Sequence, residues 1–207
     1  MRLGILGGAF NPPHIGHLLC AQEALVQLEL HRVVFMPVGV APHREIEADP
    51  GAEARLEMVE LALADDERFA ASRVELDREG PSYTSDTLEQ LRSESPEDEL
   101  FLILGGDQAA SLPSWHEPEK VLERATVAVF ERVSWSRGAI GLSIGRLPGS
   151  RDVRYLEMPL IQVSSSAIRR RVREGLPIRY LVPEKVAGYI TSHDLYGAEL
   201  AKEPLGS

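Results

Sequence analysis

Residues 7–17 read Gly-Gly-Ala-Phe-Asn-Pro-Pro-His-Ile-Gly-His. This stretch follows the apolar run Leu3–Leu6 and precedes a helical pattern over Leu18–Leu28. The order predicts a buried strand, a glycine turn and a helix whose start carries His14 and His17. Free backbone N–H groups and the positive end of a helix form an anion site, and imidazoles there can donate hydrogen bonds to phosphate oxygens. The stretch therefore predicts a site for nucleotide phosphates.

The composition is ordinary for a soluble globular domain. The chain has 207 residues, of which 43% are hydrophobic and 26% charged, and its net charge is −10. The acidic balance argues against a nucleic-acid partner, because sequence-independent binding to a phosphate backbone needs a basic face. A small phosphorylated substrate needs only a few local cations. The basic residues of the chain are mostly arginines, because Lys120, Lys185 and Lys202 are the only lysines.

No stretch predicts a membrane-bound or exported protein. The apolar runs are shorter than the roughly 18 residues that span a bilayer, and no signal-peptide pattern precedes the first strand. The single cysteine, Cys20, excludes a disulfide within the chain. We therefore expect a cytoplasmic protein without a membrane partner. The sequence leaves open whether the chain forms a homo-oligomer.

Apolar runs alternate with helical patterns along the chain. Runs typical of strands are Arg2–Leu6, Val33–Met36, Arg73–Leu76, Leu100–Leu104 and Val127–Phe130, with weaker runs at Val153–Leu156 and Leu160–Val163. Patterns typical of helices are Leu18–Leu28, Ala52–Leu63, Ser85–Arg92, Pro118–Arg124, Ser165–Arg173 and Pro183–Thr191. Continuously apolar strands that alternate with helices predict a parallel sheet covered on both faces.

The predicted fold class is α/β, a Rossmann-like doubly wound parallel sheet with a small helical C-terminal part. We expect a single domain over residues 1–197, with the helical part at about 164–197 and a tail at 198–207. The segment Glu131–Arg151 is rich in Gly, Ser and Arg, which predicts a loop.

Ligands in such a sheet bind beyond the carboxyl ends of the strands. Two glycine turns are expected at such ends, Gly7-Gly8 and Gly105-Gly106. These turns therefore mark the expected edge of the ligand site.

The spacing His14-Ile15-Gly16-His17 allows one helix start to aim both imidazoles at one site. There the rings can stabilise charge that builds on a phosphate during transfer. The alternative is that one histidine caps the helix and the other packs. The glycine turn and the strand before it favour the phosphate site, and Gly16 would let the backbone approach a ligand closely.

A second motif, Ser164-Ser165-Ser166-Ala167-Ile168-Arg169, opens a predicted helix. Serines at a helix start can simply cap it. An arginine one turn into the same helix, beside hydroxyls and free amides, also offers a clamp for a triphosphate. Only Arg169 has the register to share the anion site. The following arginines predict a solvated face (Arg170, Arg171 and Arg173).

A third group of residues follows the predicted strand Leu100–Leu104. Asp107 is placed to accept hydrogen bonds from a ribose or a base. Trp115 offers a flat face that suits an aromatic ring, although an isolated tryptophan more often belongs to the core. The junction Pro81–Thr87 has amides and hydroxyls that can hold a carboxylate or merely cap a helix.

Competing motifs are absent from the sequence. No Gly-x-x-x-x-Gly-Lys-Ser/Thr loop and no Gly-x-Gly-x-x-Gly fingerprint follows the first strand, and there is no Gly-x-Ser-x-Gly elbow. Neither paired cysteines nor a His-Glu-x-x-His arrangement suggests a zinc site. We therefore expect no metal held by protein ligands alone.

The Gly7–His17 and Ser164–Arg169 motifs together resemble the nucleotidyltransferase superfamily that carries His-x-Gly-His. Further motifs resemble the bacterial nicotinate-nucleotide adenylyltransferases, and these are Ala41-Pro42-His43-Arg44, Arg55-Leu56-x-Met58, Pro81-Ser82-Tyr83-Thr84-x-Asp86-Thr87, Gly106-Asp107, Pro113-x-Trp115 and Tyr180-Leu181-Val182-Pro183. The likeness runs from Met1 to about Gly197, as one nucleotidyltransferase domain. It implies that ATP and nicotinate mononucleotide are joined to give deamido-NAD and pyrophosphate, with Mg²⁺, in NAD biosynthesis.

The resemblance also implies a role for each motif residue. His14, His17 and Arg169 would be catalytic and stabilise the transition state at the ATP phosphates. The residues that would bind ATP are Gly7, Gly8, Ala9, Phe10, Gly16, Arg44, Gly105, Asp107, Ser165, Ser166 and Ile168. The residues that would bind the mononucleotide are Trp115, stacked on the pyridine ring, and Thr84, Ser85 and His116, which would receive its carboxylate. Mg²⁺ would arrive with ATP.

Three departures from the family pattern have expected consequences. Ala9 stands where Ser or Thr is common, which removes a hydroxyl contact to phosphate. Asn11 replaces a frequent Asp, which removes a negative charge beside the site. The region Glu131–Gly149 lacks the usual Arg-Pro-Gly turn, so no role is inferred there.

Three other functions fit part of the sequence. A related adenylyltransferase acting on nicotinamide mononucleotide or phosphopantetheine would share the histidine motif, but Tyr83–Thr87 and Trp115 favour the pyridine acid. A class I aminoacyl-tRNA synthetase fragment would carry the same motif but needs a lysine-rich second loop. A non-catalytic nucleotide sensor would be expected to lack a histidine or Arg169.

Overall fold

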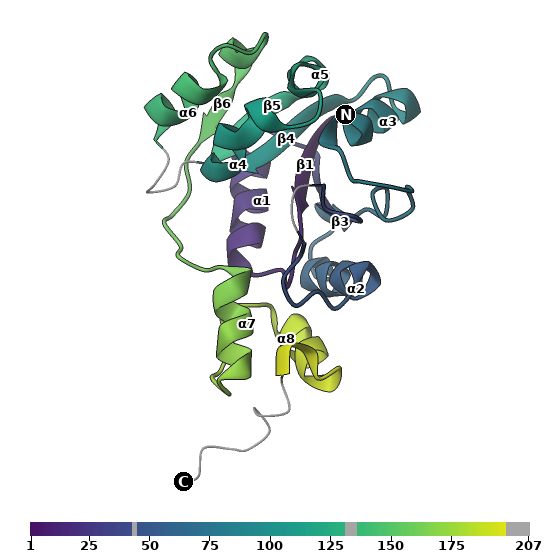
Figure 1. The fold of residues 1–207 in the computed structure, drawn as a ribbon, viewed down its shortest axis with the longest axis vertical. Helices are drawn as coiled ribbons and strands as arrows, with labels where there is room; N and C mark the ends of the chain where they lie inside the picture. The colour runs from purple at the N-terminus through teal and green to yellow at the C-terminus, as the bar shows by residue number, and fades with distance from the viewer. Residues whose placement is uncertain (43–44, 131–135, 198–207) are drawn as a thin grey trace.

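The computed structural model describes residues 1–42, 45–130 and 136–197, and its centre is a six-stranded sheet. The strands are β1 (Arg2–Gly8), β2 (Arg32–Pro37), β3 (Phe69–Ala71), β4 (Glu99–Gly105), β5 (Thr126–Phe130) and β6 (Arg154–Leu156). All neighbouring strands are parallel and lie in the order β3-β2-β1-β4-β5-β6 (Figure 1). The arrangement confirms the predicted doubly wound α/β sheet.

Helices connect the strands and continue beyond the last one. They are α1 (Ile15–Gln27), α2 (Ala52–Leu63), α3 (Thr84–Glu94), α4 (Gly106–Ser111), α5 (Pro118–Arg124), α6 (Arg137–Ile144), α7 (Ser165–Arg173) and α8 (Glu184–Ser192), with short 3-10 turns at Leu112–Ser114 and Ser150–Asp152. Within the described residues, none of these helices is long and apolar enough to cross a bilayer.

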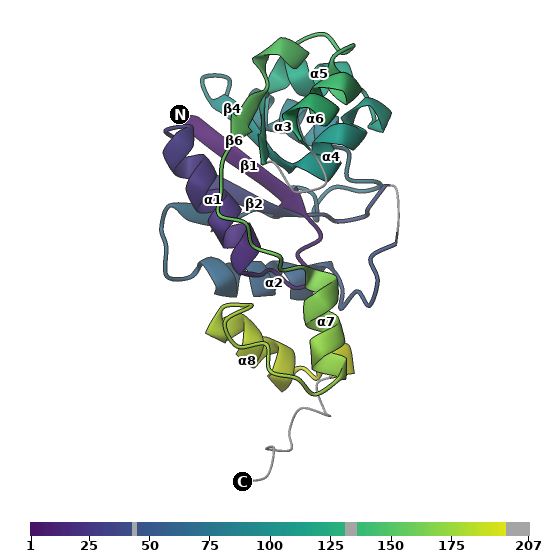
Figure 2. The same cartoon turned by 90° about the vertical axis from the view of Figure 1, so that its left-hand side faces the viewer.

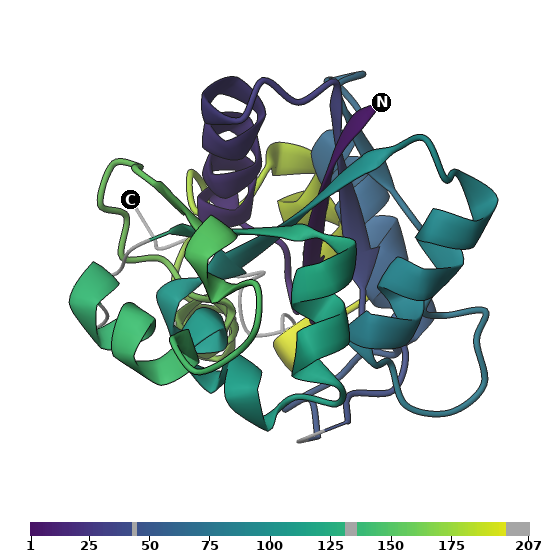
Figure 3. The ribbon, with the colours of Figure 1, turned by 90° about the horizontal axis from the view of Figure 1, so that it is seen from above.

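The sheet separates two hydrophobic clusters because successive side chains of a strand point to opposite faces. On β4, Leu102 and Leu104 belong to the cluster under α3, α4, α5 and α6, whereas Phe101 and Ile103 belong to the cluster under α1 and α2. Figure 2 shows α1 on one side of the strands and α4, α5 and α6 on the other, and the view from above in Figure 3 agrees. Covered on both faces, the strands need the continuous apolar runs seen in the sequence.

The C-terminal helices form a third cluster beyond one end of the sheet (Figure 1). Ile168 of α7 and Val186 of α8 are fully buried there against Met58 of α2. The chain reaches this place by crossing α1, where the Gln27 side chain makes hydrogen bonds with both backbone groups of Glu157 (2.6 and 3.0 Å). The predicted helical C-terminal part is therefore present, and the tail 198–207 lies outside the described residues.

Two predicted strands are wrong. Residues 73–76 form a turn closed by Leu76 N–H to Arg73 O (2.8 Å), and the edge strand is instead the short β3. The run Leu160–Val163 is irregular, with Leu160 67% exposed. Its apolar residues follow the last strand of the sheet and have no strand to pair with.

The predicted loop Glu131–Arg151 is wrong in its middle part, because α6 occupies Arg137–Ile144. The Ser136 hydroxyl caps this helix, and Ile140 and Ile144, four residues apart, pack into the core. Residues 131–135 lie outside the described part. The predicted glycine turns are also corrected, because Gly7-Gly8 close β1 and Gly105-Gly106 join β4 directly to α4.

Candidate active site

The β1–α1 loop, residues 9–14, and the start of α4 lie at the carboxyl ends of the adjacent strands β1 and β4. The strand order reverses direction at this pair, and open α/β sheets bind ligands at such a point. A side chain at Gly7 would meet no atom within 4 Å, so the end of β1 borders open space. Asp107, in the first turn of α4, is exposed beside it along the same edge.

The two histidine rings stack on one another at the start of α1. Their centroids are 3.7 Å apart with an interplanar angle of 20°, and His14, the residue before the helix, is only 6% exposed. The buried ring of Phe10 meets His17 edge-on at 5.0 Å. The spacing therefore brings both imidazoles to one place, as predicted.

The hydrogen bond between the two residues sets the tautomer of His17. Its Nδ1 accepts the backbone N–H of His14 (3.1 Å), so a neutral His17 ring carries its proton on Nε2. His17 thus caps the helix with one nitrogen and keeps an N–H donor on the other. The capping role and the phosphate role, which the sequence presents as alternatives, are compatible in this geometry.

Gly16 leaves room for the His14 ring. A Cβ at Gly16 would lie 3.0 Å from Nδ1 of His14, a distance shorter than nine in ten real Cβ contacts. We expect Gly16→Ala to displace that ring and to lower kcat by roughly tenfold or more, since small misplacements of catalytic groups have large effects. The matched control is Gly188→Ala in α8, where no atom lies within 4 Å. Steady-state kinetics measure the kcat of each variant. Equal kcat values for Gly16→Ala and Gly188→Ala would contradict the prediction.

Helix α7 brings Arg169 to the β1–α1 loop. The guanidinium is 6% exposed and donates to Asn11 O (2.8 Å) and to Glu47 Oε2 (2.7 Å). The Ser165 hydroxyl donates to Pro12 O (2.8 Å) in the same loop. The start of α7 and the histidine loop therefore form one unit, although more than 150 residues separate them in sequence.

Other predicted residues of α7 have different surroundings. Ser166 is exposed and shares a hydrogen bond with Ser164, which caps the helix through Ala167 N–H. Ile168 is fully buried in the third cluster and its N–H bonds to Ser164 O (3.0 Å), so its side chain packs in the core and does not face a ligand. Of the arginines predicted to form a solvated face, Arg170 and Arg173 are exposed, whereas Arg171 is half-buried and its Nε donates to Pro177 O (3.0 Å).

A second group of predicted residues meets at the start of α3. The ring of Tyr83, the residue before α3, lies 4.3 Å from that of His116, and Trp115 precedes His116. The first N–H groups of α3, on Thr84 and Ser85, have no acceptor within the helix. Trp115 is half-buried against the core and its Nε1 donates to Ser111 Oγ (3.1 Å). The structure therefore brings together the two segments that the resemblance assigns to one site.

Several residues around the loop have no predicted role. Arg55 of α2 is fully buried and donates to Ala9 O (3.1 Å) and Asp49 Oδ1 (2.9 Å). An arginine on the apolar face of a helix indicates a buried ionic contact, and Arg55 also belongs to the motif Arg55-Leu56-x-Met58. Glu47 and Tyr196 have no such signal, because their partners are distant in sequence. Arg44, a predicted phosphate ligand, lies outside the described residues.

Asn11 serves the loop rather than a ligand. Its Nδ2 donates to Glu47 O (2.8 Å) and Ala48 O (3.3 Å), and its Oδ1 accepts from the Tyr196 hydroxyl. An ionised aspartate cannot donate to carbonyl groups. Asparagine at position 11, where the family often has aspartate, therefore suits the two carbonyl groups that it binds.

One group of possible metal ligands occurs within the described parts of the chain, formed by Asp86, His116 and Glu117. It lies at the start of α3, not at the histidine loop. Lys120 pairs with Glu117 at 2.5 Å, and this contact lowers the pKa of the Glu117 carboxyl. The ammonium group of Lys120 thus already provides the positive charge that a metal ion would provide. An imidazole and a lysine-paired carboxylate do not fit Mg²⁺, which prefers oxygen ligands and water.

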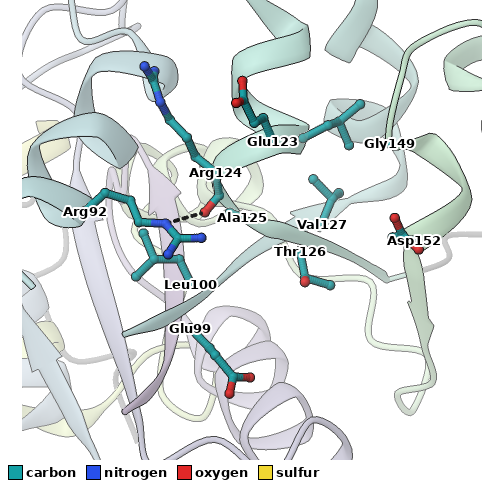
Figure 4. A pocket seen from close by; sticks show the side chains of 11 residues that line it. Arg92, Glu99, Leu100, Glu123, Arg124, Ala125, Thr126, Val127, Gly149 and Asp152 are labelled. Carbon is teal, nitrogen blue, oxygen red and sulfur yellow. Dashed lines mark hydrogen bonds between the residues drawn. The ribbon is translucent and has the colours of Figure 1, made fainter. Parts of the chain in front are cut away.

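A separate hollow of about 240 Å³ lies at the amino ends of β4 and β5 (Figure 4). Glu99 and Asp152 line it together with Arg92 and Arg124. The Arg92 Nε donates to Arg124 O (3.2 Å), so this arginine already has a partner. Mixed charge at the end of the sheet opposite the histidines gives no reason to place the phosphate site there.

Glu75 is a buried carboxyl beneath the start of α3. It accepts a hydrogen bond from Thr87 (2.9 Å), which in turn accepts one from Arg78 (2.8 Å). Burial raises the pKa of Glu75, and the Thr87 hydroxyl, the Arg78 charge and Ser82 oppose this. The folded state therefore holds this proton more tightly than the unfolded chain does.

This raised pKa predicts a pH-dependent loss of stability. The native state binds more protons, so the free energy of unfolding falls as pH rises from the ordinary carboxyl range through the raised pKa of Glu75. Gln keeps the shape and the acceptor but cannot ionise. We expect Glu75→Gln to gain stability relative to wild type as pH rises above the ordinary carboxyl range. Urea unfolding checks this against the exposed Glu60→Gln, and a pH-independent difference for Glu75→Gln would contradict it.

Comparison with known proteins places this geometry in a family. Residues 5–171 match the family model described as cytidylyltransferase-like. A probable nicotinate-nucleotide adenylyltransferase from Thermus thermophilus is 45% identical over 196 residues, covering 95% of this chain and all of that protein. The Geobacillus thermodenitrificans relative of the same name is 42% identical over 197 residues, covering 95% of this chain and 87% of the relative.

Solved structures show the same fold at low sequence identity. Plasmodium falciparum nicotinic acid mononucleotide adenylyltransferase complexed with NaAD aligns with a TM-score of 0.75 at 18% identity, covering 94% of this chain and 97% of the other. The family match over most of the chain, the level of identity and the coverage agree. This chain belongs to the cytidylyltransferase-like family and, within it, to the nicotinate-nucleotide adenylyltransferases.

Proposed function

We propose that this chain transfers the adenylyl group of ATP to nicotinate mononucleotide, giving deamido-NAD and pyrophosphate in NAD biosynthesis. The proposal rests on one observation: His14, His17 and Arg169 all lie at the β1–α1 loop, where the strand order of the sheet reverses. Relatives at 42–45% identity carry the adenylyltransferase name, and structures of similar fold are complexes with APC and NaAD.

The reaction needs no protein nucleophile. The phosphate of the mononucleotide attacks the α-phosphorus of ATP in line, and the bond to the bridging oxygen of the β-phosphate breaks. Catalysis is then positioning together with stabilisation of developing charge. His17 donates through Nε2–H, His14 lies stacked beside it, and the loop presents the backbone of Gly8, Ala9 and Phe10 to the phosphates.

Arg169 meets the β- and γ-phosphates by exchanging its partner. In the structure its Nη2 is paired with Glu47, whose side chain is 70% exposed. Because this carboxylate is exposed, it can turn into solvent when a phosphate takes its place, and the buried guanidinium then still has an opposite charge beside it. The bond from Nη1 to Asn11 O stays in place and keeps the guanidinium oriented. Ser165 and Ser166 complete the phosphate side, and Gly105 and Asp107 face the nucleoside.

The second group of residues receives the mononucleotide. Trp115 stacks on the pyridine ring, and the N–H groups of Thr84, Ser85 and His116 donate to its carboxylate. A divalent metal is expected with ATP, and we propose Mg²⁺ bound by the phosphates themselves, where it neutralises their charge. We infer a cytoplasmic enzyme whose partners are ATP and the mononucleotide.

A direct assay separates this function from its nearest alternatives. Purified protein is incubated with ATP, Mg²⁺ and either nicotinate mononucleotide, nicotinamide mononucleotide or phosphopantetheine, and pyrophosphate release is measured. We expect the highest kcat/KM with nicotinate mononucleotide. Preference for another acceptor would contradict the proposal, and nucleotide binding without pyrophosphate release would indicate a sensor.

A further inference from the structure

Three carbonyl groups of the β1–α1 loop are held by side chains from other segments. Arg55 binds Ala9 O, Arg169 binds Asn11 O, and Ser165 binds Pro12 O. The N–H and C=O of a trans peptide point in opposite directions. Because the Ala9 carbonyl points to Arg55, the N–H of Phe10 points to the other side of the loop. The contact with Arg55 therefore decides which way the Phe10 N–H faces, whereas the carbonyls of Asn11 and Pro12 precede prolines, which have no N–H.

The Asn11 side chain links this loop to the C-terminal segment. The residue is 2% exposed, and its carboxamide is held at both ends, by the carbonyls of Glu47 and Ala48 and by the Tyr196 hydroxyl. The Tyr196 and Asn11 positions are 185 residues apart. The backbone carbonyl of the same Asn11 holds Arg169, so one residue connects Tyr196 to the guanidinium.

Packing fixes the segment that carries Tyr196. Tyr189 of α8 stacks on His193 with ring centroids 3.9 Å apart, and its hydroxyl donates to Glu57 Oε2 (3.0 Å) in α2. Tyr196 packs against the third cluster, the one that contains Ile168 of α7. Burial raises the pKa of the Tyr196 hydroxyl, which therefore stays protonated and able to donate at neutral pH.

We propose that Tyr196 is a positioning residue for adenylyl transfer, acting through Asn11 on the histidine loop and on Arg169. The inference rests on the proposed function. Removal of the hydroxyl would free the carboxamide to rotate and would loosen the loop backbone. The effect falls on the phosphate side, because among the described residues Tyr196 contacts Asn11 and the third cluster, not the residues around Trp115.

The test is Tyr196→Phe in the full-length chain, with Tyr189→Phe as the matched control. Both variants lose one hydroxyl hydrogen bond in the same cluster, but only the first loses its bond to Asn11. We expect Tyr196→Phe to lower kcat by about tenfold, the equivalent of one hydrogen bond, with the KM for nicotinate mononucleotide unchanged. Tyr189→Phe should lower Tm while kcat stays near wild type.

A double-mutant cycle with Asn11→Ala keeps the proposal testable through a second variant. Alanine removes the Oδ1 that accepts the Tyr196 hydroxyl, so it breaks the same link from the other end. The two effects on kcat should combine to less than their product, since both changes break one connection. A kcat for Tyr196→Phe within about twofold of wild type, or independent effects in the cycle, would overturn the positioning role. Absence of adenylyl transfer by the wild-type protein would instead refute the proposed function.

Discussion

Replacing His17 with alanine is expected to lower kcat by roughly a hundred- to a thousandfold while the fold persists. The Nε2–H of His17 is a fixed donor because its Nδ1 is occupied by His14 N–H at 3.1 Å. Loss of one such preorganised donor removes stabilisation that is greatest when charge develops on the phosphates. Steady-state kinetics with ATP and nicotinate mononucleotide, together with circular dichroism, measure both parts of the prediction.

Two further variants separate catalysis from helix capping. His17→Asn offers a side-chain oxygen that can accept the His14 N–H but has no nitrogen in the place of Nε2. We expect it to keep the stability of wild type and to share the loss of activity. His31→Ala is the matched control, because His31 Nδ1 accepts Arg2 N–H (2.9 Å) at the opposite end of β1. Near wild-type kcat for His17→Asn would show that His17 is only a cap.

Replacing Arg169 with lysine is expected to lower kcat roughly a hundredfold, even though the charge is kept. The guanidinium bonds at once to Asn11 O (2.8 Å) and to the carboxylate that we expect phosphate to displace. A single ammonium cannot occupy both positions with the geometry of a planar fork. The loss should appear in kcat and in the KM for ATP, but not in the KM for the mononucleotide.

The neighbouring residue supplies the control for this substitution. Arg170 is exposed on the same helix, so Arg170→Lys changes the same chemical group at a solvated position. We expect its kinetics to match wild type. If Arg169→Lys and Arg170→Lys were equally active, Arg169 would have no part in phosphate binding.

The main elements of the fold could be predicted because pattern and packing agree. Helix α2 matches its predicted bounds, since Leu56, Val59 and Leu63 form one buried face. Strand β4 could be predicted because its residues are buried on both faces of the sheet. Here local periodicity records the final environment of each side chain.

Predictions failed where local composition conceals the environment. Gly138, Gly141 and Gly145 suggest a loop, but Ile140 and Ile144 give α6 its buried face. The edge strand β3 has three half-buried residues and no alternation that could identify it. A short edge strand is fixed by pairing with its neighbour, which no local pattern reveals.

In the candidate site, too, some contacts could be predicted from the sequence and others could not. His14, Gly16 and His17 are adjacent in sequence, so the helix geometry that joins them could be predicted. That Arg169 shares their site follows from its register in α7. Its contact with Glu47 and the link from Asn11 to Tyr196 depend on the tertiary fold, because 122 and 185 residues separate the partners.

A crystal structure of the protein with a non-hydrolysable ATP analogue and nicotinate mononucleotide tests the central claim most directly. We predict that polyphosphate oxygens lie within hydrogen-bond distance of His17 Nε2 and of Arg169, with Glu47 displaced. The pyridine ring should lie over Trp115. A polyphosphate bound at the amino ends of the strands, or Arg169 still paired with Glu47 and out of reach of the phosphates, would contradict the account.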